Sequence, residues 1–128
     1  MKKFAALALL ILPIQSFAAD KCMDTANTDT EIEECASQEL GQADSALDSA
    51  YEAALAELDK MASDGDEGAA EAKKQLISAQ QKWDDFRKAD CDVTFFMNVG
   101  GSIRIPATMK CMADHANQRR QVLQHLFD

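Results

Sequence analysis

The sequence predicts an all-α protein: an antiparallel three-helix bundle with a long disulfide-bounded loop between the second and third helices. Apolar residues recur every three or four positions over helical lengths, which is the first observation behind this prediction. The second is a Ser-Asp-Gly-Asp turn at 63–66, because a short turn between two long helices favours an antiparallel pair. The third is a set of four cysteines that these helices would bring to one end of the bundle.

The first 18 residues have the pattern of a secretory signal peptide. Lys2 and Lys3 precede an apolar run over 4–14, and Ser16-Phe17-Ala18 places small residues at the −3 and −1 positions of a cut after Ala18. The apolar run is too short to span a bilayer. We therefore predict export to the periplasm or the medium, with a mature chain of residues 19–128 that forms a single helical domain.

The charge balance excludes several classes of protein. The 128 residues include 13 Lys and Arg against 22 Asp and Glu, a net charge of −9, and loss of Lys2 and Lys3 with the signal peptide moves this charge to −11. Proteins that bind nucleic acid or anionic lipid need a basic surface. No apolar stretch of membrane-spanning length remains after the cut. We expect a soluble protein whose partner is neither nucleic acid nor membrane.

The first helix is expected to run from Thr30 to about Met61. Thr30 and Glu33 have the capping-box spacing that is typical of helix starts. Apolar or small residues then form one stripe at spacings of three and four: Ile32, Ala36, Leu40, Ala43, Leu47, Ala50, Ala54, Leu58 and Met61. Such a helix is about 45 Å long, and Gly41 weakens it by up to about 1 kcal/mol.

The second helix is expected over residues 67–91, and its inner face comprises Leu76, Ala79, Gln80, Trp83, Phe86 and Arg87. Between 92 and 107, apolar residues alternate around Gly100-Gly101, which predicts a loop or a short β-hairpin. Pro106 and Thr108 introduce the third helix, whose expected inward residues are Met109, Met112, Ala116, Leu123 and Leu126.

Cys22, Cys35, Cys91 and Cys111 are an even set, which in an exported protein favours two disulfides. A metal site would be expected to use closely spaced pairs such as C-x-x-C, and the sequence has none. The numbers of residues that separate the cysteines from the turn at Gly65 place all four thiols near one end of the bundle. Three pairings are possible, and we favour Cys22–Cys35 with Cys91–Cys111 because each closes a local loop.

One stretch of the second helix carries polar residues on its inner face. Trp83 and Arg87 are four residues apart and share a helical face with Gln80. On that face the guanidinium requires a carboxylate, and Asp44 or Asp48 lies at a suitable level of the first helix. We favour a core tryptophan beside a buried ion pair that fixes helix register, and the alternative is contact with a ligand or partner.

Several motifs are spread over nearly the whole mature chain. They are Cys22 and Cys35, Ala43-Asp44-x-x-Leu47, Tyr51, Ala79-Gln80-x-x-Trp83-x-x-Phe86-Arg87-x-x-x-Cys91, Gly100-Gly101-Ser102, Cys111 and Arg119-x-x-x-Leu123. Together they resemble the LprI-type lysozyme-inhibitor domain family, and one departure is Ala116, where the family often has threonine. The resemblance implies a small, all-helical, disulfide-bonded exported domain and, for some members, inhibition of lysozyme. It implies no catalytic residues. The structural motif positions in this chain are Asp44, Tyr51, Gln80, Trp83, Arg87 and Arg119.

We expect the segment between Cys91 and Cys111 to carry the binding function. A disulfide across its base would limit its conformational entropy, and the two glycines would let its backbone approach a partner closely. The expected contact residues are Gly100, Gly101, Ser102 and Ile103. Lysozymes are commonly basic, so an acidic chain would be steered toward them. The sequence therefore predicts an exported binding protein that inhibits lysozyme by occluding the enzyme's cleft.

Two other functions stay open at this point. An envelope module that binds another protein or a wall fragment would share all of these features. A periplasmic metal-binding protein would use Met109, Met112 and His115, which share one helical face and include thioethers that suit copper(I). Catalysis is not expected, because the sequence has no G-x-S-x-G, H-E-x-x-H or P-loop motif, and no cofactor is expected either.

Overall fold

The computed structural model describes residues 17–128, which form four helices and no strand. The helices are α1 (Phe17–Thr25), α2 (Asp29–Ser63), α3 (Ala69–Met97) and α4 (Arg104–Gln124). The all-α fold class is confirmed, and the short helix α1 is an addition that the sequence did not predict. Most of the predicted signal peptide lies outside the described residues. None of the four helices is long and apolar enough to cross a membrane.

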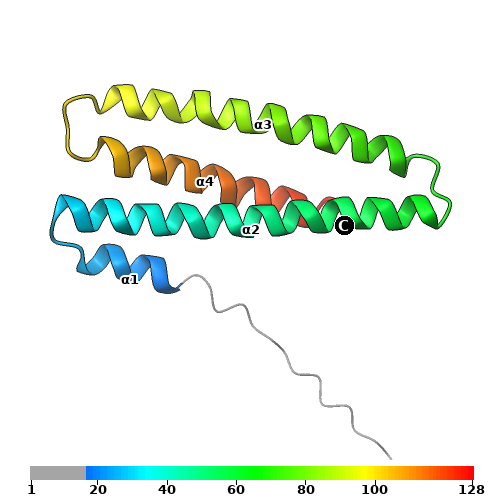
Figure 1. The fold of residues 1–128 in the computed structure, drawn as a ribbon, viewed down its shortest axis with the longest axis horizontal. Helices are drawn as coiled ribbons and strands as arrows, with labels where there is room; N and C mark the ends of the chain where they lie inside the picture. The colour runs from blue at the N-terminus through cyan, green and yellow to red at the C-terminus, as the bar shows by residue number, and fades with distance from the viewer. Residues whose placement is uncertain (1–16) are drawn as a thin grey trace, which may run out of the picture.

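The three long helices lie side by side (Figure 1). α3 runs back along α2, and α4 then returns in the direction of α2 and packs most extensively against it. α1 folds back along the first part of α2. The turn between α2 and α3 therefore lies at one end of the bundle. The connections α1–α2 and α3–α4 lie at the other end (Figure 1).

A capping box starts α2, but it lies two residues before the predicted one. Thr28 Oγ1 accepts a hydrogen bond from the Glu31 backbone N–H at 3.2 Å, and Glu31 Oε2 accepts from the backbone N–H of Thr28 at 3.1 Å. The Asn27 N–H also donates to this carboxylate, and these bonds lower the pKa of Glu31. The prediction of Thr30 and Glu33 was wrong because the sequence holds two overlapping T-x-x-E patterns.

The connection between α3 and α4 is much shorter than the loop or hairpin predicted over 92–107. The two helices cover most of that segment, and only residues 98–103 connect them. A short alternating apolar run fits a helix as well as a strand, and here it continues α3. α3 ends at Met97, and the turn that follows passes through Gly100, whose φ of 91° is a conformation that glycine adopts without strain. Pro106 lies in the first turn of α4, where its missing N–H is not needed.

Small and aliphatic side chains from the three long helices form the core. The buried cluster comprises Ala43, Leu47, Ala54, Leu58, Leu76, Ala113, Ala116 and Leu123. Ala113 and Ala116 are completely buried, and their small size lets α4 approach its neighbours closely. Three residues predicted to face inward do not: Ala79 is exposed, and Phe86 and Leu126 are 57% and 44% exposed.

Candidate binding surface

Arg87, the one buried charged residue among those that the structure describes, links three helices. Its Nη2 donates to Asp44 Oδ1 at 2.6 Å, and its Nε donates to the Met112 carbonyl oxygen at 3.0 Å. The guanidinium also lies 5.3 Å from the centre of the Trp83 ring, which suits a cation–π contact. Arg87 is only 5% exposed. Asp44 is thus the carboxylate partner, as the sequence suggested, but its side chain is 43% exposed and Trp83 is half-buried, so only the Arg87 side of the pair is buried.

A shallow groove of about 440 Å³ between α2 and α3 contains five of the six motif positions. These five are Asp44, Tyr51, Gln80, Trp83 and Arg87. The sixth, Arg119 on α4, donates through Nε to Gln80 Oε1 at 3.0 Å, and burial lowers its pKa, an effect that the nearby Tyr51 opposes. Two bonds among these positions therefore link the long helices: Arg87 to Asp44 joins α3 to α2, and Arg119 to Gln80 joins α4 to α3.

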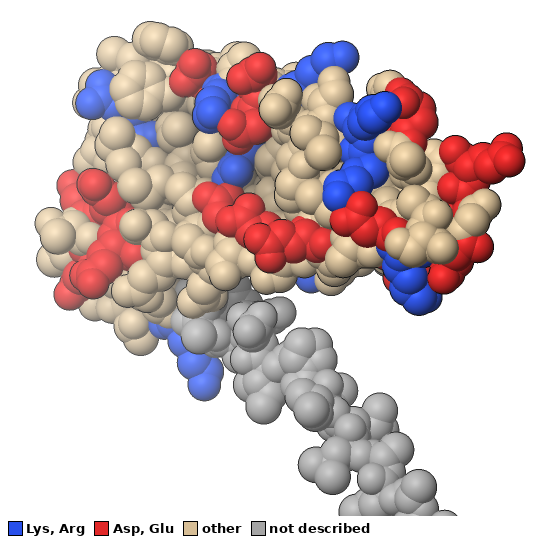
Figure 2. All heavy atoms as spheres, turned by 45° about the vertical axis from the view of Figure 1, so that its right-hand side comes forward, with Lys and Arg blue, Asp and Glu red and all other residues tan. Residues whose placement is uncertain are grey.

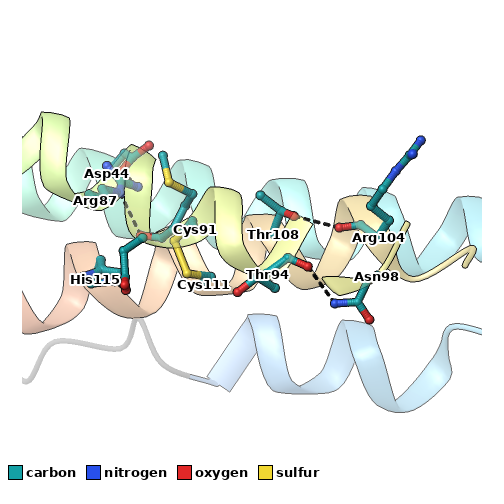
Figure 3. Close-up of a disulfide and its surroundings, with 11 residues drawn as sticks. Asp44, Arg87, Cys91, Thr94, Asn98, Arg104, Thr108, Cys111 and His115 are labelled. Atoms are coloured by element: carbon teal, nitrogen blue, oxygen red, sulfur yellow. Dashed lines mark hydrogen bonds and ion pairs between the residues drawn. A yellow bond between two sulfur atoms is a disulfide. The ribbon is translucent and has the colours of Figure 1, made fainter. Parts of the chain in front are cut away.

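The two disulfides join Cys22 to Cys35 and Cys91 to Cys111, the pairs that local loop closure favoured. The first ties α1 to α2 with a Cα–Cα distance of 5.6 Å, and the second ties α3 to α4 with a distance of 5.7 Å. Figure 3 shows that Cys91 and Cys111 both belong to helical segments. The second disulfide therefore braces two packed helices rather than the base of a long loop.

Large apolar side chains are exposed where α3 ends and the chain turns into α4. We call this surface the apolar tip: it comprises Val93, Phe96, Met97, Val99 and Ile103. Their exposed fractions run from 56% for Ile103 to 81% for Met97. Single exposed apolar residues are ordinary, whereas larger exposed apolar patches often mark interaction sites in proteins.

Side-chain contacts hold the residues next to the apolar tip in place. The Phe95 ring meets the Phe96 ring edge to face at 5.4 Å, and the Arg104 guanidinium lies 4.7 Å from the Phe95 ring centre. Asn98 Nδ2 donates to the Thr94 carbonyl oxygen at 2.8 Å, which holds the end of α3 (Figure 3). These contacts and the disulfide fix the tip to the bundle.

The charge of the molecule is concentrated on α2. This helix carries ten Asp and Glu residues and a single Lys. Figure 2 shows acidic side chains in a band along the part of the surface that α2 occupies. Exposed acidic side chains of this kind attract a basic partner over several ångströms and lose this effect in salt.

The family described as "Lysozyme inhibitor LprI" matches residues 20–123. This chain belongs to the LprI family. One relative is an uncharacterized protein of Rhizobium meliloti (strain 1021). The two chains are 31% identical over 97 residues, which cover 73% of this chain and 70% of the relative. No solved structure matches the chain.

In this LprI family member, the four contact residues predicted from the sequence are all exposed in the α3–α4 connection: Gly100, Gly101, Ser102 and Ile103. Ile103 belongs to the apolar tip. Sequence reasoning missed the contributions of Val93, Phe96 and Met97, because it assigned them to a loop or hairpin. Their spacing along one side of a continued α3 is the signal that could have found them.

His115, named in the metal-binding alternative, already has partners in this LprI family member. Its Nε2 lies 2.7 Å from Asp90 Oδ2, and its ring meets Phe86 edge to face at 5.6 Å. In the part of the chain that the structure describes, Cys91, Cys111 and His115 form a group of three potential metal ligands. The two sulfurs are bonded to each other, so they are not available to a metal ion in this oxidised form.

Proposed function

We propose that this LprI family member inhibits lysozyme by placing its apolar tip in the enzyme's substrate cleft. The observation that carries the proposal is the exposure of five large apolar side chains around the α3–α4 connection, in a family described as lysozyme inhibitors. The connection lies at an end of the bundle (Figure 1), a position from which it can enter a concave site.

The support of the tip favours binding. A surface that is already ordered loses little conformational entropy when it binds. The Cys91–Cys111 disulfide and the Asn98 hydrogen bond hold this surface before any partner arrives. The connection includes the exposed residues Gly100 and Gly101, where no side chain keeps the partner away from the backbone.

Electrostatic attraction adds to this mode of binding. The acidic band on α2 would raise the rate at which the protein meets a basic lysozyme, and added salt would lower that rate. The apolar tip itself is composed of uncharged side chains. We therefore assign the acidic band to long-range attraction and the apolar tip to the contact.

We also propose that the protein acts after export. The first 18 residues have the composition of a signal peptide, and two disulfides are typical of an oxidising compartment. Lysozyme acts on the cell wall, so an inhibitor would meet it outside the cytoplasm.

The contact can be tested with matched substitutions of two equally exposed residues. Ile103→Asp places a charge in the apolar tip, whereas Val122→Asp places the same charge on α4, where the valine is 55% exposed. We expect Ile103→Asp to raise the Kd for a basic lysozyme by at least ~10-fold, because a buried carboxylate would lack a partner. Titration calorimetry gives both constants. Equal Kd values for the two variants would contradict the assignment of the contact to the tip.

A bulky substitution at the turn provides a steric version of the same test. Gly101→Trp suits this test because Gly101 is exposed and a Cβ there would lie 3.5 Å from the Asn98 carbonyl oxygen, an ordinary contact. In the complex, however, the indole would collide with the cleft wall. Gly41→Trp on the exposed surface of α2, where a Cβ meets nothing within 4 Å, is the control.

A further inference from the structure

We propose that reduction of the Cys91–Cys111 disulfide creates a zinc site with Cys91, Cys111 and His115 as its ligands. The two Sγ atoms and one ring nitrogen of His115 lie within 4.8 Å of one another. Two cysteines and a histidine, with a fourth position left to water, are a ligand set that Zn²⁺ uses in proteins. The site shares no residue with the apolar tip, and metal binding is measured without lysozyme, so either proposal can fail without the other.

Helix geometry directs the three side chains toward a common point. Cys111 and His115 are four residues apart on α4 and therefore share one face of that helix. Cys91 faces them from α3, and it is 1% exposed, so water has little access to its sulfur. Figure 3 shows His115 beside the disulfide.

Asp90 supplies the group that orients the imidazole. Its Oδ2 lies 2.7 Å from His115 Nε2, which leaves the other ring nitrogen for a metal ion. Histidines that bind zinc in proteins commonly pair their second nitrogen with a carboxylate in this way. Asp90 is thus a positioning residue of the proposed site.

The two helices are held together at this level by more than the disulfide. Arg87 lies one turn before Cys91 on α3, and it bonds to the carbonyl of Met112, the residue after Cys111 on α4. The cysteine Cα atoms are 5.7 Å apart. Zinc–sulfur bonds of about 2.3 Å in a tetrahedral site place the sulfurs roughly 3.8 Å apart, a separation that side-chain rotation alone can supply.

The conversion requires a two-electron reductant, and a dithiol supplies the electrons in two exchange steps. A thiolate of the reductant attacks one sulfur of the disulfide, the Cys91–Cys111 bond breaks, and a mixed disulfide forms. The second thiol of the reductant then displaces the protein sulfur, so the reductant is oxidised to its own disulfide and the protein gains two thiols. Zn²⁺ displaces one proton from each thiol and binds neutral His115, with no change in its own oxidation state.

Cobalt(II) provides a spectroscopic probe for this site. We would reduce the Cys22→Ser/Cys35→Ser variant with a phosphine in water, which supplies the oxygen of the phosphine oxide and the two thiol protons, and titrate it with Co²⁺ alone. We expect one ion per chain, a thiolate-to-cobalt charge-transfer band, and loss of this band when Zn²⁺ is added. Removal of Cys22 and Cys35 ensures that the band reports the α3–α4 pair.

Two histidine variants and one aspartate variant test the ligand set. We expect His115→Ala to weaken Co²⁺ binding at least ~100-fold, since it removes a ligand, and Asp90→Asn to weaken it ~10-fold. His125→Ala, at the C-cap of α4, should bind like the parent.

Four results would each overturn the proposal. The first is the absence of a charge-transfer band after reduction. The second and third are Co²⁺ binding by His115→Ala, or by the oxidised protein, that equals Co²⁺ binding by the reduced parent. The fourth is a loss of helical circular dichroism on reduction that Zn²⁺ does not restore. The fourth result would overturn the proposal because the packed helices must keep the three ligands in place.

Discussion

Replacing Arg87 with alanine is expected to lower the free energy of unfolding by about 3 kcal/mol, because it removes the central link between three helices. The change deletes the ion pair with Asp44 and the hydrogen bond to the Met112 carbonyl. It also leaves a cavity beside Trp83, which loses its guanidinium contact. This loss is at the lower end of the range for breaking a buried ion pair, because the Asp44 side chain is 43% exposed and can be rehydrated.

Urea denaturation followed by circular dichroism measures this effect without relying on Trp83 fluorescence, which the substitution itself would alter. Lys88→Ala is the matched control, because Lys88 is the next residue on α3 and its pair with Asp84 is exposed on both sides. We expect no measurable change for this exposed pair. Similar unfolding midpoints for Arg87→Ala and Lys88→Ala would show that the buried link does not stabilise the bundle.

Replacing Cys91 and Cys111 together with serine is also expected to lower the free energy of unfolding by about 3 kcal/mol. The disulfide joins residues 20 positions apart, and its removal restores conformational freedom to the unfolded chain. Typical domains have a total stability of about 5–15 kcal/mol, so this is a large fraction. We further expect weaker lysozyme binding, because the apolar tip would lose its brace.

The Cys22→Ser/Cys35→Ser variant distinguishes the effect of losing any disulfide from the specific effect of losing the Cys91–Cys111 disulfide. That bond joins residues 13 positions apart and ties only α1 to the rest of the bundle. We expect its loss to release α1 while the cooperative unfolding of the three long helices changes less. Differential scanning calorimetry would show this as a smaller shift in Tm. The reverse order of the two shifts would mean that α1 stabilises the core more than the α3–α4 brace does.

The long helices could be predicted because their apolar repeats are strong and extend over many turns. The pattern from Ile32 to Met61 agrees with α2, and the Gly65 turn agrees with its end. The Arg87 ion pair was also predictable, since a guanidinium on an inner face requires a carboxylate. Helix ends were less certain, because Thr28 and Thr30 both head a capping pattern and local sequence does not choose between them.

The binding surface could not be predicted in the same way. A short apolar run from Val93 to Phe96 is compatible with a strand, a loop or a helix, and tertiary packing decides among them. The sequence also does not show which apolar residues stay exposed, so Phe86 was placed in the core. The apolar tip follows only from the structure, in which α3 continues past the Cys91–Cys111 disulfide.

The central claim is that the apolar tip blocks the cleft of lysozyme, and the rate of cell-wall lysis tests it most directly. A basic lysozyme would be mixed with rising amounts of the protein, and the clearing of a bacterial cell-wall suspension would be followed by turbidity. We predict that the lysis rate falls toward zero as the protein reaches molar excess, and that Ile103→Asp requires at least ~10-fold more protein for the same effect. An undiminished lysis rate at a large excess of the wild-type protein would contradict the claim.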